Sequence, residues 1–512
     1  MLAWTIYLSF AGAAAVLLTP KDKPQVTRVV ALLTALIGLG IAIAGTIGYA
    51  PGTLVTVTQT AWIPTLGIGY HLAADGISLV LLLLTGIAAT AGVLFSWNID
   101  TRVREFFAFY LVLIGGVYGV FLSFDLFLLF VFYEIAIIPK YFLIAIWGSA
   151  PNGDTSKRTY AAMKLALYSF AGSALVLGGI LAAWVESGAK TFDMQTLASY
   201  PFPVHFEMWA FPLVFVGFAV LAGMWPFHTW APTGHAAAPT AASMLLAGVV
   251  MKLGAYGCLR VAMMLFPAGL GGWGFHVLGF GSWRAVFALL ALIGIVYGAS
   301  VALVQQDFKF VIGYSSVSHM GFVLLGLMTL SQIGLNGAVL QMFSHGVIAG
   351  LLFAVVGRMV YDRTHTRDLR ILSTMRLGKT LPFVAVVFTL AAMASIGMPG
   401  FSGFIAEFQV IVGVWHTMPW MVFVVGFGIL VGIGFTWRAL TKAFFSEGER
   451  RLAAGAAQHA ELTPVTWAER CGSLLLLAAT ITVGLYPQIL MRLIVPSLNS
   501  PLFAALRNGG WR

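Results

Sequence analysis

Long apolar runs, separated by short polar stretches, dominate the sequence. About fourteen can be traced, starting near Leu2, Val29, Gly76, Glu105, Asp125, Tyr160, Trp209, Thr240, Arg284, Phe308, Ile333, Leu381, Trp420 and Gly472. Each run approaches the roughly 20 residues that a helix needs to cross a bilayer core. The longest polar connections hold about twenty residues, too few for a folded soluble domain. The pattern predicts an all-α polytopic membrane protein with about fourteen transmembrane helices.

The composition excludes several other classes of protein. Apolar residues make up 60% of the chain and charged residues only 9%, against roughly 25% in soluble proteins. The two cysteines, Cys258 and Cys471, lie in or beside apolar runs, which argues against a disulfide framework or a cysteine-ligated cluster. The net charge of +10 comes from short loops rather than from a basic domain, so we expect no nucleic-acid partner.

The distribution of lysine and arginine predicts the orientation. With both termini outside, nineteen of the 28 Lys and Arg residues lie in inner loops and five lie outside, and the opposite orientation inverts this bias. Cytoplasmic loops carry the excess of positive charge, so we predict that the N- and C-termini face outward. No cleavable leader precedes the first run, Leu2 to Thr19, which we interpret as the first span.

Two runs are interrupted by glycine and proline. Gly-Met-Trp-Pro-Phe-His at 223–228 breaks the seventh, and Gly-Met-Pro-Gly-Phe-Ser-Gly at 397–403 breaks the twelfth. Carbonyls freed inside a bilayer must be satisfied by protein or by water in a cavity. Each break falls in the fourth helix of a set of five, helices 4–8 and 9–13. Because five is odd, the second set is inverted, and broken helices in inverted repeats indicate an ion pathway near the midplane. Two unrelated proline kinks are the plainer alternative.

This interpretation divides the chain into four regions. We predict three N-terminal helices in 1–103 and the first five-helix repeat in 104–265. The inverted second repeat follows in 283–445, and a C-terminal loop, helix 14 and tail occupy 446–512.

Ionisable residues stand inside six of the predicted spans. They are Glu134, Lys164, Lys252, His319, His345 and Glu407. A charge at the bilayer centre costs roughly 2.5–3.5 kcal/mol on insertion scales, so six such residues predict a function. Two unit charges about 4 Å apart interact by about 4 kcal/mol at an effective dielectric of 20. Charge movement at one group can therefore load or release a proton at the next, and we predict a proton-exchanging chain.

Each position also has a structural alternative. A lysine near a span end can extend its ammonium to the interface, and a lone histidine can simply bind a serine. Lys140 is a separate case, because it lies six residues after Glu134, which is about 120° around a helix and about 9 Å along it. It joins the pathway or faces a neighbouring helix, and the sequence leaves both open.

Motifs for cofactors are missing from the sequence. No Walker A, HExxH or cysteine cluster is present, and the glycines of 426–432 lie in an apolar run, where they indicate close helix packing. His228 and His235 flank the first break without a third ligand nearby in sequence. We expect no cofactor and no metal in this chain.

Several segments resemble one protein family. They are Phe-Tyr-Glu-Ile-Ala-Ile-Ile-Pro-Lys at 132–140, Pro-Phe-His-Thr-Trp-Ala-Pro-Thr-Gly-His at 226–235, Leu-Ala-Gly-Val-Val-Met-Lys-Leu-Gly at 246–254 and Tyr-Ser-Ser-Val-Ser-His-Met-Gly-Phe at 314–322. They look like motifs of the proton-pumping, antiporter-like membrane subunits of respiratory complex I. Glu407 resembles the M-type branch, because the other branches and the Mrp antiporters usually have lysine there.

The resemblance implies roles for the buried residues. Glu134 matches the family's essential fifth-helix glutamate, and Lys252 matches its central lysine. His345 matches the histidine that continues the relay, Glu407 matches the terminal acid, and His319 and Lys164 match auxiliary positions. Leu221 departs from the family, which usually has a lysine there as partner of the glutamate. Our hypothesis is that Lys140 replaces that lysine from another helix.

The resemblance leaves three functions open. The first is a proton-translocating subunit of NADH-quinone oxidoreductase, an enzyme whose NAD, FMN and iron–sulfur clusters lie in partner subunits. Its neighbours would be L-like and N-like membrane-arm subunits in a bacterial plasma membrane. The others are a Mrp-type sodium/proton antiporter subunit and a membrane-arm subunit of a related hydrogenase or ferredoxin-dependent complex.

Overall fold

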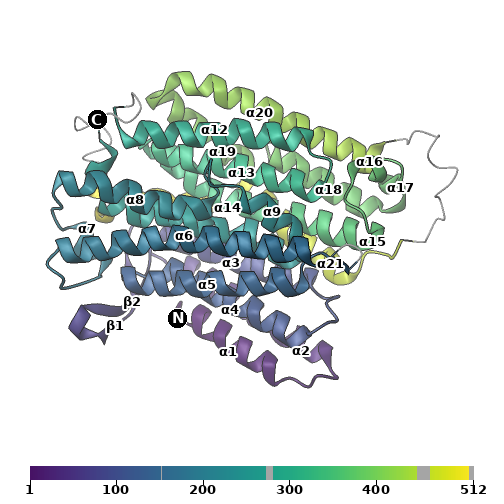
Figure 1. Ribbon diagram of the computed structural model, residues 1–512, viewed down its shortest axis with the longest axis horizontal. Coiled ribbons are helices and arrows are strands. Elements are labelled where there is room, and N and C mark those ends of the chain that lie inside the picture. Colours follow the sequence, from purple (N-terminus) through teal and green to yellow (C-terminus); the bar gives the residue numbers. More distant parts are fainter. Residues whose placement is uncertain (151–152, 272–280, 447–461, 507–512) are drawn as a thin grey trace.

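The computed structural model describes residues 1–150, 153–271, 281–446 and 462–506, and it is a bundle of roughly aligned helices (Figure 1). Twelve helices of this described part are long and apolar enough to cross a membrane. α1 is shorter, and the predicted twelfth run is divided between two short helices. Every apolar run predicted from the sequence is therefore helical, although the seventh and the twelfth are split.

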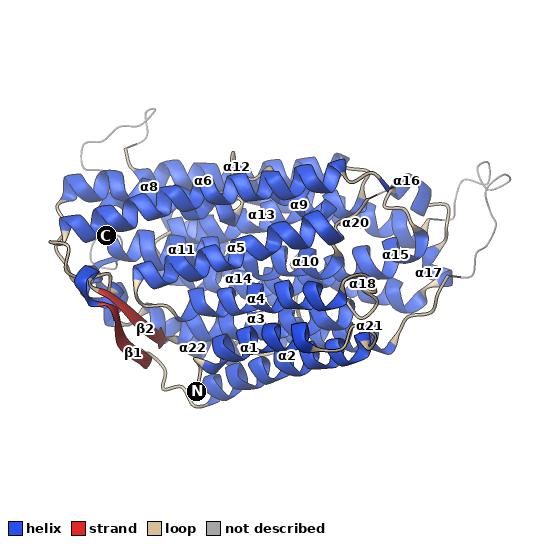
Figure 2. Ribbon diagram, turned by 60° about the horizontal axis from the view of Figure 1, so that its bottom comes forward, coloured by secondary structure: helices blue, strands red, loops and turns tan. Residues whose placement is uncertain are grey.

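The N-terminal region holds three helices and one β-hairpin. Its elements are α1 (Trp4–Leu18), α2 (Pro24–Ile47), β1 (Val55–Ile63), η1 (Pro64–Leu66), β2 (Ile68–Ala74) and α3 (Gly76–Phe95). The antiparallel strands form the only sheet in the described residues (Figure 2). The hairpin is a small addition to the predicted all-α membrane fold, which is confirmed as predominantly helical. The β-branched sequence Val-Thr-Val-Thr favours a strand, but it is too short to register in a search for apolar runs of about 20 residues.

The first predicted set of five helices ends in a long buried helix. Its elements are α4 (Val103–Leu122), α5 (Leu126–Trp147), α6 (Ser156–Glu186), α7 (Met194–Ala198), α8 (Val204–Ala222), α9 (Trp230–Ala237), α10 (Thr240–Leu245), η3 (Leu246–Val250), α11 (Met251–Gly257), η4 (Cys258–Met263) and η5 (Pro267–Leu270). α10 to η4 form one continuous span, in which η3 and η4 are π-helical. We call this span the central helix.

The second set begins after residues outside the described part. Its elements are α12 (Trp283–Val304), α13 (Phe308–Met328), α14 (Gln332–Ala354), η6 (Val355–Tyr361), α15 (Asp362–Thr364), α16 (Leu369–Leu372), α17 (Leu377–Thr380), α18 (Pro382–Ser395), α19 (Ser402–Thr417), α20 (Pro419–Leu440) and η7 (Thr441–Phe445). α21 (Trp467–Leu485), α22 (Gln488–Leu498) and η8 (Pro501–Phe503) complete the described chain. Much of the predicted C-terminal loop, 447–461, and the tail from 507 lie outside the described residues.

Both predicted breaks are present. α8 ends at Ala222 and α9 begins at Trp230, while α18 ends at Ser395 and α19 begins at Ser402. Gly223 and Gly397 follow α8 and α18 closely and have φ angles of 81° and 73°. These are left-handed values that L side chains rarely adopt, so glycine is what allows the chain to leave each helix at this point.

The two sets share a local motif at opposite ends of the bundle. Asp125 caps α5, and backbone hydrogen bonds on either side of it pair with the residues around Asp193. Asp307 caps α13 in the same manner, and the backbone around it pairs with the residues around Asp368. An aspartate accepts from the free amides at a helix N-terminus, which fixes where each helix starts.

The helices differ sharply in their surroundings. The central helix and α14 are buried along their length. In contrast, α2 and α20 lie on opposite edges in Figure 1 and expose large apolar side chains such as Leu36, Phe423 and Leu430. A helix that is apolar and exposed requires lipid or another protein around it. A site shielded from lipid is therefore expected along the buried central helix and α14.

Candidate functional site

Lys252 lies near the middle of the central helix and is fully buried. Its Nζ donates to the backbone oxygen of Ala247 in η3 and lies 2.7 Å from Nδ1 of His345 on α14. A π-helical segment disturbs the normal ladder of backbone bonds, which is consistent with a side chain reaching a carbonyl there. An ammonium has only donors, so the facing imidazole nitrogen is the acceptor when this lysine is charged.

His319 and Glu407 form a second pair. Nδ1 of His319 on α13 lies 2.9 Å from Oε1 of Glu407 on α19. Gln341 on α14 donates to the same carboxylate oxygen over 3.1 Å, and Oγ of Ser395 lies 3.3 Å from Nε2 of His319. The pair is therefore held by groups on two further helices, and one proton can reside on either the imidazole or the carboxylate.

A small cavity joins the two pairs. The rings of His319 and His345 are 5.5 Å apart between centroids, and both line a cavity of about 10 Å³ together with Gln341, Ser395 and Glu407. That volume is near the minimum for one water molecule. Nε2 of His345 has no hydrogen-bond partner among the described residues. The four side chains thus run from the central helix to α19, and we call Lys252, His345, His319 and Glu407 the relay.

The second helix break makes room for the acid of the relay. A Cβ atom at Gly397 would lie 3.1 Å from Oε2 of Glu407, so the carboxylate sits against the backbone of the break. Hydroxyl groups hold the far side of the break, where Oγ of Ser402 lies 2.8 Å from Ser344 and 2.9 Å from Thr480. Gly397 therefore both allows the turn at the break and leaves space for the carboxylate of Glu407.

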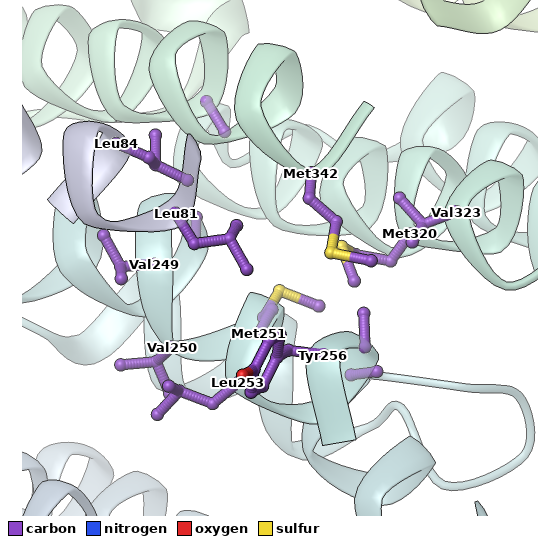
Figure 3. Packing of buried hydrophobic residues seen from close by; sticks show 14 of the residues in the cluster. Leu81, Leu84, Val249, Val250, Met251, Leu253, Tyr256, Met320, Val323 and Met342 are labelled. Carbon is purple, nitrogen blue, oxygen red and sulfur yellow. The ribbon is translucent and has the colours of Figure 1, made fainter. Parts of the chain in front are cut away.

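A buried apolar cluster includes residues adjacent in sequence to two members of the relay. Figure 3 shows Met251, Met320 and Met342 packed with Leu81 and Val249 in a buried cluster. Met251 and Met320 are the sequence neighbours of Lys252 and His319. In such surroundings a charge interacts more strongly with its neighbours than it would in water.

The first set of helices presents a different arrangement. Glu134 on α5 is half-buried, and its Oε1 has no hydrogen-bond partner among the described residues. Lys140, also on α5, is 1% exposed, and its Nζ likewise has no hydrogen-bond partner in the described chain. The two charges act on each other electrostatically without forming an ion pair.

Lys164 and Leu221 lie apart from that pair. The ammonium of Lys164 on α6 is 5.8 Å from the ring of Tyr160 and acts electrostatically on His228 in the first break. No ion pair joins Lys164 to Glu134 in the part of the chain that the structure describes. Leu221 is buried in the last turn of α8. The structure thus brings four of the seven predicted residues together and leaves Glu134, Lys140 and Lys164 outside.

Sequence reasoning missed two residues of the site. Gln341 and Ser395 contact Glu407 and His319 but carry no charge, so a search for ionisable groups passes over them. Gln341 could have been found, because it precedes His345 by four residues and therefore shares its face of α14. Ser395 gives no comparable signal, since its position depends on the break that follows it.

The hairpin end of the bundle holds a further polar pair outside the spans. Nδ1 of His71 on β2 lies 2.6 Å from Oδ2 of Asp193. Burial opposes the charge of Asp193, but hydrogen bonds from His71 and Thr196 outweigh it and hold the pKa of this carboxyl below its usual range. Burial raises the pKa of Asp125 nearby, which caps α5.

The chain matches known proteins along most of its length. Residues 123–434 match the family described as NADH:quinone oxidoreductase/Mrp antiporter, TM. NADH-quinone oxidoreductase subunit M of Escherichia coli is 36% identical over 507 residues, covering 95% of each chain. Subunit M of Pseudomonas aeruginosa is 36% identical over 463 residues, covering 88% of each.

Solved structures agree with these relatives. A chain of respiratory complex I from Thermus thermophilus with bound NADH has a TM-score of 0.86 and 25% identity, covering 99% of this chain and 100% of that one. A chain of the Mrp complex from Dietzia sp. has a TM-score of 0.83 at 21% identity, covering 99% of each, which shows a shared fold alone. The family match and the subunit M relatives together establish that this chain belongs to the NADH-quinone oxidoreductase subunit M family, a family of multi-pass membrane proteins.

Proposed function

We propose that this chain is a membrane-arm subunit of a bacterial NADH-quinone oxidoreductase and that it passes protons along the relay. The redox groups, NAD, FMN and iron–sulfur clusters, belong in this proposal to partner subunits, and L-like and N-like subunits are its neighbours in the membrane. Moving one charge against 100 mV takes about 2.3 kcal/mol, and electron transfer in the partners supplies it. The subunit M relatives support this assignment over a Mrp-type antiporter.

One observation carries the proposal: four titratable side chains from four helices, three of them buried and His319 largely so, lie next to one another in series. Lys252 is bonded to His345, whose ring faces that of His319, and His319 is bonded to Glu407. Each of these four side chains is an acid or a base whose charge changes when it binds a proton. When Glu407 takes up a proton it loses its negative charge, so its attraction for a protonated His319 weakens. This change in electrostatic interaction is transmitted to Lys252 through the two histidines.

The first set supplies protons in this proposal. Glu134 is the acid that exchanges protons on that side. Lys140 is the cation that acts on Glu134, in the role for which the family usually has a lysine at the position of Leu221. Lys164 is an auxiliary residue. The electrostatic interaction between Glu134 and Lys140 supports the substitution of one lysine by the other.

We also propose the orientation and the repeat. Arginines concentrate at one end of the bundle, where Arg28 binds Asp100, Arg363 binds Glu469 and Arg438 binds the backbone oxygens of Leu303 and Gln305. The excess of positive charge assigns this end to the cytoplasm, which leaves the hairpin end outside together with both termini. The matched motifs at Asp125 and Asp307 support inverted repeats in 104–265 and 283–445.

The proposal is tested with the intact complex in liposomes. NADH-driven proton uptake into the vesicles is measured with a pH-sensitive dye, alongside NADH oxidation, for the wild-type complex and for Lys252→Met and His319→Leu variants. We expect both variants to lose translocation while the complex still assembles and retains its flavin and iron–sulfur signals. Normal translocation in either variant would show that protons take another route.

A further inference from the structure

A second row of polar groups leads from Lys252 toward the hairpin end. Tyr256 follows Lys252 by four residues, so the two side chains share one face of the central helix about 6 Å apart along its axis. The guanidinium of Arg260 lies 5.4 Å from the ring of Tyr256. Arg260 in turn donates to Oδ2 of Asp75 over 2.6 Å. We call Tyr256, Arg260 and Asp75 the outer branch.

The members of the outer branch are deeply buried. Tyr256 and Arg260 are 0% exposed, and Asp75 is 2% exposed. The hydroxyl of Tyr256 donates to the backbone oxygen of Phe121 over 3.3 Å and lies 3.4 Å from Oγ of Ser78. Burying an arginine and an aspartate costs several kcal/mol for each ion before their attraction offsets it. A simple link between α3 and the central helix could be made more cheaply with apolar side chains.

The guanidinium has unused hydrogen-bonding capacity. Nε and Nη1 of Arg260 have no partner within the described residues, although both are buried. The rings of Phe124, Tyr256 and Phe503 surround the group at 5.1 to 5.4 Å from its central carbon. The cation is thus held by one carboxylate and an aromatic cage rather than by a full set of acceptors, which leaves it able to change partner.

Asp75 also borders an open hollow. A hollow of about 310 Å³ at the hairpin end is lined by Asp75 together with Thr53, Gln195, Ser199 and Ser500. These polar side chains come from the segment before β1, from α7 and from the segment around η8. Asp75 therefore has Arg260 on its inner side and a hollow wide enough for many water molecules on its outer side.

We infer that the outer branch is a proton release route from Lys252 and that the Arg260–Asp75 ion pair is its gate, an inference that rests on the proposed function of Lys252. A fixed positive charge in a narrow path repels protons, so the closed pair blocks back-flow from the outer side. When Arg260 turns away from Asp75, the carboxylate accepts a proton arriving by way of Tyr256 and passes it to water in the hollow. Each step moves one proton between oxygen or nitrogen atoms, and no redox change is involved.

The test is the passive proton leak of the intact complex in liposomes without NADH. A potassium gradient with valinomycin imposes a membrane potential, and the proton influx that it drives is followed with an internal pH-sensitive dye. Lowering a barrier by about 1.4 kcal/mol raises a rate tenfold, so we expect Arg260→Met to increase the leak at least about tenfold. Arg260→Lys keeps the charge and should leak like the wild type.

Two further variants separate the gate from a structural role. Arg363→Met removes an equally buried arginine, paired with Glu469 over 2.7 Å at the other end of the bundle, and should not leak. If Arg260→Met does not assemble, Arg260→Gln removes the positive charge but keeps a hydrogen-bond donor for Asp75, and its leak decides the question. A wild-type leak in that variant, or in Arg260→Met, overturns the inference.

The same assay distinguishes this inference from the proposed function. Adding Lys252→Met to Arg260→Met should abolish the extra leak, because the branch starts at Lys252, and a leak that persists overturns the route. If Lys252→Met alone pumps normally, the proposed function itself is wrong. If Lys252→Met stops pumping while the passive proton leak of Arg260→Met stays at the wild-type level, only the inference about the outer branch is wrong.

Discussion

The two sets of helices each contain a broken helix and an aspartate cap whose backbone pairs with the residues around a second aspartate (Asp125 with Asp193, and Asp307 with Asp368). Their buried charges are nevertheless organised differently. From Lys252, at the end of the first set, and on through the second set, each member of the relay is hydrogen-bonded to the next one or lies with its ring beside it. In the first set, Glu134 and Lys140 interact only through space, and the buried position at 221 is a leucine. The comparison teaches that two sets of helices with shared backbone motifs can carry differently organised polar side chains. Among the predicted site residues, direct contacts between titratable side chains begin only at Lys252.

Loss of Lys252 should have the largest effect. Lys252→Met removes the hydrogen bond between the central helix and His345, and removing a positioned proton-transfer group costs about 10²-fold or more. We expect NADH-driven proton uptake into liposomes to fall about a hundredfold. Lys309→Met is the matched control, since this equally buried lysine donates to Ala238 away from the relay. Equal losses in the two variants would mean that any buried ammonium matters only for folding.

Loss of Gln341 should have the next largest effect, confined to the second set. Gln341→Leu removes a hydrogen bond to the carboxylate of Glu407, and such bonds to charged groups contribute about 1.5–3 kcal/mol. We expect proton translocation to fall about tenfold while NADH oxidation with an uncoupler is unchanged. Gln332→Leu on the same helix, whose amide donates to Asn336, is the control. A Gln341→Leu complex that pumps at the wild-type rate would remove this glutamine from the site.

Loss of Lys140 should have a smaller effect. Lys140→Met removes a charge that acts on Glu134 across space, and a loss of about 1 kcal/mol corresponds to about a fivefold lower rate. Adding Leu221→Lys to this variant should restore translocation if one lysine replaces the other. Normal pumping in Lys140→Met together with lost pumping in Lys164→Met would instead assign the role to Lys164. Both rates are measured in liposomes at the same NADH concentration.

The smallest effect is expected at the hairpin end, away from either set's buried charges. The pKa of Asp193 is below its unfolded value, so its hydrogen bond with His71 stabilises the fold above the unfolded pKa of about 3.9, and this stabilisation is lost as the pH falls further. Asp193→Asn should lower local stability by about 1 kcal/mol at pH 7, which makes the amides of β2 exchange about fivefold faster. Hydrogen exchange of the purified complex measures this, and pumping should be unchanged. A slower pump would place Asp193 in the pathway.

Much of the fold could be predicted from the sequence because lipid imposes a simple rule. Runs of about twenty apolar residues become helices, and the Gly and Pro clusters near 223 and 397 break two of them. The hairpin of Val55–Ile63 and Ile68–Ala74 was missed, because strands are short and their signal is local. The division of the central helix into α-helical and π-helical segments also has no sequence signature that we recognise.

The candidate site was predictable in its residues but not in its connections. The cost of burying charge identifies Lys252, His345 and Glu407 from the sequence alone. Which of them touch depends on how α13, α14, α19 and the central helix cross, and this follows from side-chain packing over the whole bundle. The neutral Gln341 enters the site only through that packing.

The most direct test of a single relay is the number of protons translocated per NADH oxidised by Lys252→Met, by Glu407→Gln and by the double variant. Residues that act in series are not additive, because one interruption already stops the flow. We therefore predict that the double variant loses no more than the more severe single variant. Independent, cumulative losses in the double variant would show that Lys252 and Glu407 serve separate routes, and the relay proposed for this chain would be wrong.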